Sequence, residues 1–155
     1  MEPHDRPGAA LIAVANRQRH PVDLRRLRRT AGMALRALGV WDHELSLTLV
    51  DDRQIRALNS RYRGVRRRTD VLAFPLAGPA PVLGEAVISV ETAGRQARAG
   101  GHSLAEELDL LGCHACLHLV GYDDRDPHEA RLMHAREMAL LGRLYERPAA
   151  TLHVV

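Results

Sequence analysis

The segment HACLHLVGYDD, residues 114–124, brings two histidines, a glycine and two carboxylates into one short stretch. Each residue of a helix turns by about 100°, so His114 and His118 project from the same face, one turn apart. Two imidazoles in this position can hold one divalent ion. The competing interpretation is a buried helix that contains two histidines and no metal, and the spacing alone does not exclude it.

A third ligand is available just beyond the histidines. Gly121 can adopt the left-handed conformation that ends a helix, which turns the chain so that Asp123 or Asp124 returns beside His114 and His118. Two imidazoles and one carboxylate leave a coordination position open for water. An open position is characteristic of a catalytic metal site, whereas structural sites are closed.

Two alternative sites in this segment are disfavoured. Cys113 and Cys116 lie about 150° around the helix from the midpoint of the histidine pair, so we expect them to pack into the core. Metallopeptidases of the HExxH type carry a glutamate directly after the first histidine, where it accepts a proton from water. Here that position is Ala115. A hydrolase that acts on an anionic substrate is therefore favoured over a peptidase.

The chain has 155 residues, of which 46% are hydrophobic and 26% charged, as in an ordinary globular protein. This length is enough for a single domain, residues 1–155, with a core that needs no structural metal. All 22 cationic side chains are arginine. Aromatic residues make up only 3%, which argues against recognition of nucleic acid by rows of stacking rings.

The charge is unevenly distributed, although the net charge is only +3. Residues 17–36 carry seven arginines and one aspartate, and residues 53–68 carry seven arginines and no acid. Residues 85–137 carry ten acids and five arginines. One part of the molecule should attract polyanions, and another could hold cations. For the first arginine cluster, a solvated helix face is an equally good interpretation.

The cysteines and the N-terminus bear on localisation. Cys113 and Cys116 are too close within one predicted helix for a structural disulfide, which indicates a reducing compartment. The first residues, MEPHDRPGAALIAVAN, lack the cationic start and long apolar core of a signal peptide. No segment approaches transmembrane length. We therefore expect a cytoplasmic protein that does not contact membranes.

Apolar periodicity predicts four strands followed mainly by helices. Strands are expected over residues 11–15, 44–50, 69–76 and 83–90, and helices over 24–38, 52–58, 91–99, 104–121 and 127–144, with a loose tail from 147 to 155. Ser103 and Glu106 form a capping box for the helix that carries the histidines. The predicted fold is α+β: one domain with a mostly four-stranded sheet, four to five helices and a metal site at the end of a central helix.

The same segment resembles a known family. HACLHLVGYDD is similar to the HGxLHLxGYDH signature of the YbeY endoribonucleases, which are bacterial ribosomal RNA maturation factors. Three further stretches resemble that family in the same order: YRGVRRRTDVLAFPL from residue 62, LGEAVISV from residue 83 and HEARLMHAREMALL from residue 128. The resemblance extends from about Asn16 to Tyr145, and four ordered motifs are far more specific than one.

The resemblance implies a zinc site of three histidines. The first two match His114 and His118, and the third position is Asp124 in this chain. Aspartate binds zinc, but its negative charge makes the bound water less acidic, and an oxygen ligand shifts selectivity toward harder ions. We expect one Zn²⁺ per chain, with Mn²⁺ or Ni²⁺ as alternatives. His128 and His102 are other candidates for the third ligand, and Asp123 matches a residue that orients a ligand.

The resemblance also assigns roles to arginines. Arg63 matches the arginine of the YRG motif, which in the family lies near the metal and can stabilise a phosphate in the transition state. A surface turn is the simpler interpretation of Arg63. Arg66, Arg67 and Arg68 replace the KDKP stretch of the family, and we expect them to bind the RNA backbone. Thr69 and Asp70 follow in register, or simply begin a strand.

The resemblance therefore implies a metal-dependent endoribonuclease of single-stranded RNA. The resemblance implies action in 3′-end maturation of the small-subunit ribosomal RNA and in ribosome quality control, with ribosomal RNA and the small subunit as partners and no DNA. The expected catalytic residues are Arg63, His114 and His118, with Asp124 as the third metal ligand. The alternatives are an RNA-binding assembly factor whose metal site has decayed and, less favoured, a peptidase.

Overall fold

The computed structural model describes residues 11–76 and 82–145, with side chains described through residue 142. In chain order, the elements are β1 Leu11–Asn16, α1 Leu24–Ala37, β2 Glu44–Val50, α2 Asp52–Arg63, β3 Val71–Pro75, β4 Val82–Ser89, α3 Val90–Gly100, α4 Leu104–Leu119 and α5 Pro127–Tyr145. The predicted α+β fold is confirmed for this part of the chain. The tail predicted from residue 147 lies outside the described residues.

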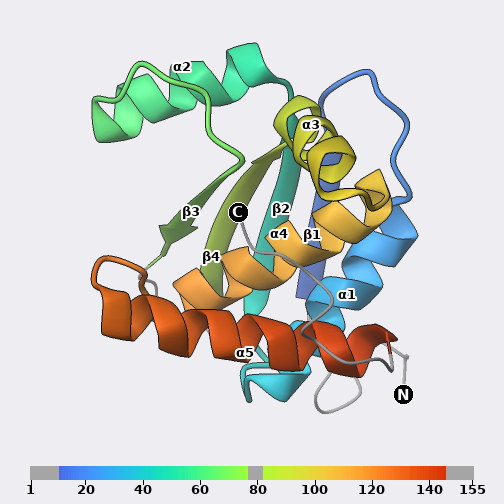
Figure 1. Cartoon of the computed structure of the whole chain (residues 1–155), viewed down its shortest axis with the longest axis vertical. Coiled ribbons are helices and arrows are strands. Elements are labelled where there is room, and N and C mark those ends of the chain that lie inside the picture. Colours follow the sequence, from blue (N-terminus) through green and yellow to red (C-terminus); the bar gives the residue numbers. More distant parts are fainter. Residues whose placement is uncertain (1–10, 77–81, 146–155) are drawn as a thin grey trace.

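The four strands form one mixed sheet in the order β1-β2-β4-β3. The strands β1, β2 and β4 are parallel, and β3 is antiparallel to β4. Adjacent residues of a strand face opposite sides of its sheet. Accordingly, Ile88 of β4 packs into the main core with residues of α1 and α4, while Val87 packs with Ile55 of α2. The helices α1 and α4 therefore cover one face, and α2 covers part of the other (Figure 1).

The helix that carries the histidines, α4, is the central element of the helical layer. It begins at a capping box in which Ser103 accepts from the backbone N–H of Glu106 (3.1 Å) and the Glu106 carboxylate accepts from the N–H of Ser103 (3.2 Å). It packs against α1, α3, α5 and the sheet, and most of its side chains are buried. A helix enclosed in this way holds its side chains in fixed directions.

Most boundaries differ from the sequence prediction by one or two residues, and two differences have a clear local cause. The helix predicted to end at residue 58 continues to Arg63, where Gly64 ends it with φ +68°. Glycine adopts this left-handed conformation at little cost, and the neighbouring Asn59 and Ser60 are tolerated within the helix. The strand predicted to end at Val90 ends at Ser89, because the Ser89 hydroxyl accepts from the N–H of Thr92 and caps α3.

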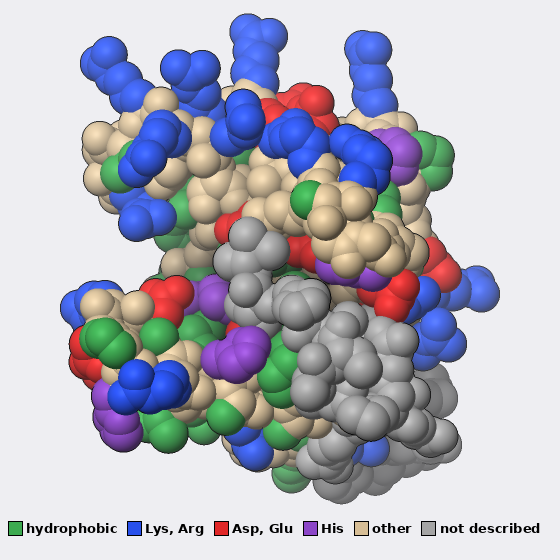
Figure 2. Space-filling model, viewed as in Figure 1, with side chains coloured by type: hydrophobic (Ala, Val, Ile, Leu, Met, Phe, Trp, Pro, Cys, Tyr) green, Lys and Arg blue, Asp and Glu red, His purple; other side chains and the backbone are tan. Residues whose placement is uncertain are grey.

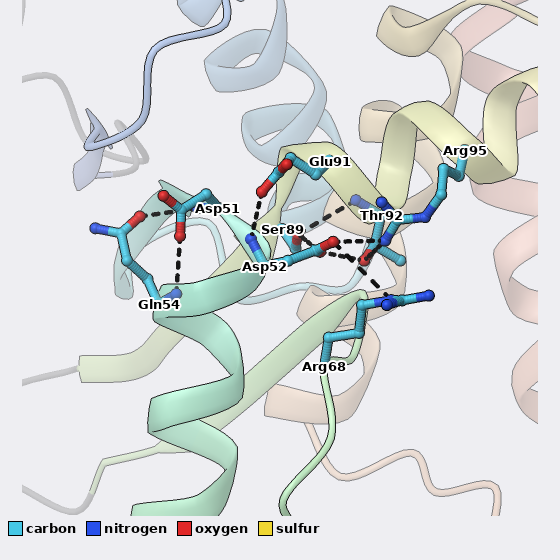
Figure 3. A network of polar contacts seen from close by, with 8 residues as sticks. All are labelled: Asp51, Asp52, Gln54, Arg68, Ser89, Glu91, Thr92 and Arg95. Carbon is cyan, nitrogen blue, oxygen red and sulfur yellow. Dashed lines mark hydrogen bonds and ion pairs between the residues drawn. The ribbon is translucent and has the colours of Figure 1, made fainter.

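A polar network joins the start of α2 to the start of α3 (Figure 3). The Asp52 carboxylate accepts hydrogen bonds from Ser89 (2.7 Å), Thr92 (2.6 Å) and Arg95 (2.7 Å). Arg68 approaches the same carboxylate, with its Nε 3.9 Å away. Burial alone would raise the pKa of Asp52, but these hydrogen bonds outweigh it and lower the pKa. The network therefore fixes α2 against α3 through an ionised side chain.

Candidate metal centre

His114 and His118 meet at the C-terminal half of α4, as their spacing predicts. Their Nε2 atoms are 3.0 Å apart, and their rings are nearly perpendicular, at 78° with centroids 4.6 Å apart. Both side chains are partly buried. The two imidazoles therefore direct the same ring nitrogen toward one point.

The partners of the other ring nitrogens decide what those Nε2 atoms can do. The Nδ1–H of His118 donates to the backbone carbonyl of Tyr122 (3.1 Å), and Nδ1 of His114 lies 2.5 Å from the Glu137 carboxylate. Since both partners accept hydrogen bonds, each Nδ1 carries a proton, and the Nε2 atoms are the ones left to share a proton or to bind a metal ion. Two Nε2 atoms 3.0 Å apart require a proton or a metal ion between them. The donor set thus fits a divalent metal ion.

The loop after α4 brings Asp124 to the histidines. Gly121 adopts φ +107°, the turn predicted from its position. Within residues 11–76 and 82–145, one group of side chains could hold a metal ion: His114, His118 and Asp124, whose ligand atoms lie within 4.8 Å of one another. Asp124 is exposed, whereas the histidines are partly buried. Two imidazoles and a carboxylate form the donor set of a catalytic zinc site.

Asp123 supports this loop through its side chain. Its carboxylate accepts from the N–H of Asp124 (2.7 Å) and forms an ion pair with Arg125 (2.5 Å). The contact is with the main chain of Asp124, so Asp123 orients the loop rather than an imidazole. Within the described residues, Asp123 makes no hydrogen bond with His114 or His118, and its charge acts on His118 through space.

Glu137 is a site residue that the sequence analysis missed. It is 1% exposed and lies on α5, where it faces His114 on α4. Burial alone would lower the pKa of His114, but the hydrogen bond and charge of Glu137 outweigh it and raise the pKa. A carboxylate behind a ligating histidine fixes its ring and increases its basicity. The available signal was a lone glutamate between Met133 and Leu141 on the apolar face of α5.

The pKa of His118 shifts in the opposite direction. Burial lowers the pKa of His118, and the neighbouring His114 lowers it further. A neutral His118 keeps its Nε2 lone pair available for a metal near neutral pH.

A small polar cavity lies behind His114. Its volume is about 20 Å³, enough for one water molecule, and its polar lining comes from Asp70, Gln96, Glu107, His114 and Glu137. Oε1 of Gln96 is buried and makes no hydrogen bond within the described structure. Burial raises the pKa of Glu107, although His102 opposes that shift by hydrogen bonding at 2.5 Å. Asp70 of the TDVLAFP motif thus reaches the surroundings of His114.

The arginines singled out in the sequence lie at the edge of the molecule above this site. Arg63 is the last residue of α2, and Arg66, Arg67 and Arg68 follow in the loop to β3, all of them exposed. Figure 2 shows arginine side chains along the upper edge, over α2 and α3, and histidine side chains in the hollow between that edge and α5. Arg68 differs from the others because it approaches Asp52.

The remaining candidates lie elsewhere. Cys113, Ala115 and Cys116 are fully buried, so the prediction that the cysteines pack into the core is confirmed. His102 pairs with Glu107, and His128 is exposed and outside the metal group. None of the described helices has the length and apolar character to cross a membrane.

Comparisons with known proteins bear on the whole domain. The family model described as endoribonuclease YbeY matches residues 13–145. A relative from Anaeromyxobacter sp. (strain Fw109-5), named endoribonuclease YbeY, is 50% identical over 122 residues, which cover 77% of this chain and 63% of that protein. A relative of the same name from Syntrophus aciditrophicus is 37% identical over 147 residues, covering 88% of this chain and 91% of that protein.

Two further findings are the share of the relatives that this chain covers and its similarity to a solved structure. The chain spans somewhat less than two thirds of the Anaeromyxobacter relative. The solution structure of a protein from Thermotoga maritima superposes with a TM-score of 0.60 and 23% identity, covering 90% of this chain and 95% of that one, which shows a shared fold. Because the family model spans the sheet, α4 and α5, the chain belongs to the YbeY family.

Proposed function

We propose that this protein is a metal-dependent endoribonuclease of single-stranded RNA. The observation that carries the proposal is the convergence of the two histidine side chains and the Asp124 carboxylate, with ligand atoms within 4.8 Å of one another, in a chain of the YbeY family. The names of the relatives support RNA as the substrate. As in the family, we infer action in 3′-end maturation of small-subunit ribosomal RNA and in ribosome quality control.

The chain's own residues divide the work between metal and phosphate. His114, His118 and Asp124 would hold Zn²⁺, or Mn²⁺ or Ni²⁺ in its place. The ion, when bound, supplies the Lewis acidity that activates water and neutralises charge on the phosphate. Glu137 holds the ring of His114 through Nδ1, and Asp123 holds the backbone of Asp124.

Arginines would supply the contacts with RNA. Arg63, at the exposed end of α2, would bind the reacting phosphate with its two-pronged guanidinium. Arg66 and Arg67 extend from the following loop into solvent, where they can bind the RNA backbone. Arg68 would exchange its approach to Asp52 for a phosphate, since a 3.9 Å ion pair at the surface is weak.

Bound metal and RNA cleavage, measured together, test this function. We would compare wild type with His118→Ala and Asp124→Ala, and use His128→Ala as the control, because His128 is a nearby histidine outside the metal group. We expect stoichiometric metal and cleavage in wild type and the control, and loss of both in His118→Ala. Cleavage that survives both site substitutions in rigorously purified protein would refute the proposal.

A second function is favoured by one observation, the exposure of Asp124 at the position where the family motif has a histidine. A weak third ligand would leave an RNA-binding assembly factor without catalysis. That protein would contain no stoichiometric metal after purification, and it would bind RNA with a strong salt dependence. Elemental analysis of the freshly purified chain separates the two functions.

A further inference from the structure

A groove lined by arginines runs along α1, away from the metal group. It encloses about 670 Å³ and is lined by Ile12, Arg25, Arg28, Arg29, Gly32, Met33, Arg36 and Trp41. These residues come from β1, α1 and the segment before β2. We call this feature the α1 groove. It shares no residue with His114, His118 and Asp124, which lie on α4 and the loop after it.

The arginines of α1 serve two different purposes. Arg26 turns inward and donates to the buried Asp109 (2.8 Å), which also accepts from Thr30 (2.7 Å). Arg25, Arg28, Arg29 and Arg36 are exposed, and in the described part of the chain they make no ion pair. Arg26 thus belongs to the core, and the other four do not.

Folding explains Arg36, which lies in the last turn of α1 where a cation is favourable, but it does not explain Arg25, Arg28 and Arg29. One helix face carries Arg25, Arg28 and Arg29, because the second and third lie three and four residues after the first. Like charges at this spacing destabilise a helix by a few tenths of a kcal/mol per pair. A helix with an Asp23 cap and a buried stripe of Leu27, Ala31 and Leu35 is complete without them. Their positive field therefore fits an anionic partner.

The rest of the groove is suited to a flat apolar group. Trp41 is 37% exposed and is the only tryptophan of the chain. Ile12 and Met33 are partly buried and pack against the main core, so they form a firm apolar floor. An exposed indole beside guanidinium groups is the combination that proteins use for single-stranded nucleic acid, because bases stack on the ring and phosphates meet the cations.

We propose that the α1 groove binds a second stretch of single-stranded RNA, outside the metal centre. This rests on the proposed function only for the identity of the substrate. A purely acidic peptide such as poly-glutamate would satisfy the arginines, but it offers no ring to stack on Trp41. RNA long enough to reach both places should bind more tightly than RNA that reaches the metal group alone.

Trp41 supplies a direct test of binding. We would titrate His118→Ala protein, in the presence of chelator, with a single-stranded RNA oligonucleotide and record tryptophan fluorescence. Binding is then measured without cleavage, so failure of the nuclease proposal cannot imitate failure of this one. We expect saturable quenching by RNA and none by poly-glutamate. Unchanged fluorescence at RNA concentrations that saturate the protein would overturn the proposal, and equal quenching by poly-glutamate would assign the groove to an acidic protein.

A charge-matched pair of variants tests the arginines. Arg25→Gln/Arg29→Gln/Arg36→Gln removes three charges from the groove, and Arg19→Gln/Arg98→Gln/Arg131→Gln removes three exposed charges elsewhere. The groove variant should bind RNA about tenfold or more weakly, and its slope of log Kd against log salt concentration should fall by about 2. The control should change much less. Equal losses in both variants would show that only net charge matters, and would overturn the proposal.

Discussion

At the residue scale, the hydrogen-bond partners of the imidazoles matter as much as the imidazoles themselves. The Tyr122 carbonyl and the Glu137 carboxylate each accept a hydrogen bond from an Nδ1–H, so the Nε2 atoms are left to bind a metal ion. The backbone N–H of Asp124 donates to the Asp123 carboxylate in the loop after α4. The metal affinity of this chain should therefore depend on residues that do not touch the metal.

Glu137→Gln is the sharpest test of this dependence. The glutamine oxygen can still accept from His114, so the ring stays in place, but the negative charge that strengthens the ligand is lost. We expect metal affinity to fall by about 10- to 100-fold. Competition with a chromophoric chelator would measure it. Glu129→Gln, an exposed change on the same helix, should leave the affinity unaltered, and a wild-type affinity in Glu137→Gln would contradict the assigned role.

The sequence showed the histidines but not Glu137, for a physical reason. His114, His118 and Gly121 are neighbours in the chain, and helix geometry alone predicts how they project. Glu137 is 23 residues from His114, and their contact exists only because α5 packs on α4. Local periodicity carries no information on which helix faces meet. The indications available were a charge on an apolar stripe and the place of Glu137 in the stretch HEARLMHAREMALL, which resembles the family.

At the element scale, the site depends on how closely the sheet approaches α4. Gly84 on β4 adopts φ +151°, and a Cβ there would lie 2.5 Å from the carbonyl oxygen of Phe74 and 2.8 Å from Leu119 at the end of α4. Only glycine permits this approach of β3, β4 and the helix that carries His118. The absence of a side chain at Gly84 thus allows the close packing of the sheet against α4, the helix that carries His118.

Gly84→Ala should therefore destabilise the fold strongly. The methyl group must displace backbone as well as a side chain, which costs about 2–4 kcal/mol. Gly94→Ala is the matched control, because Gly94 lies inside α3 with its nearest side-chain atom at 3.6 Å. Helix propensity makes that change neutral or stabilising by up to about 1 kcal/mol. Denaturant unfolding would compare the two, and equal stabilities would refute the steric explanation.

The junction of α2 and α3 should make stability depend on pH through Asp52. Its folded pKa is lower than its unfolded value, so its contribution to the free energy of unfolding is fully present above the unfolded pKa of 3.8 and is lost as the pH falls through the folded pKa. We would compare wild type with Asp52→Asn between about pH 6 and pH 3. The stability difference should be constant at the upper end and shrink at the lower end. A difference independent of pH would contradict the ionised network.

The elements themselves were largely predictable, and their arrangement was not. Alternation in ELSLTLV and the cap at Ser103 are local signals, and the corresponding strand and helix formed as expected. The helix α2 was predicted to end at residue 58 but continues to Arg63, and within it Asn59 is buried and donates to the Arg67 carbonyl (2.9 Å). The insertion of β4 between β2 and β3 is a long-range choice that no local pattern encodes.

At the scale of the whole molecule, the charges divide between an arginine-rich surface and an acidic interior around the metal group. The loop of Arg66 and Arg67 and the α1 groove are exposed, whereas Glu107 and Glu137 are almost fully buried. The exposed arginines attract the phosphates of RNA, and the buried acidic residues favour a cation at the metal group. Both ligands should therefore stabilise the folded state.

Metal binding should raise the melting temperature. A ligand that binds only the folded state at about 100 times its Kd adds about 2.7 kcal/mol, which corresponds to about 5–10 °C for a chain of this size. Calorimetry with Zn²⁺, and again after chelation, would measure the shift. His118→Ala should show none. A shift of the same size in His118→Ala would place the metal elsewhere.

The two buried cysteines of α4 allow the local opening of this helix to be measured. Cys113 and Cys116 are 0% exposed, and burial raises the pKa of Cys116 to about 12, so neither reacts with a thiol reagent while α4 is packed. They are the only two cysteines of the chain. The rate at which a thiol reagent labels them therefore measures how often α4, the helix that carries His114 and His118, opens. Metal should slow that rate, which would report the rigidity of the site without any measurement of cleavage.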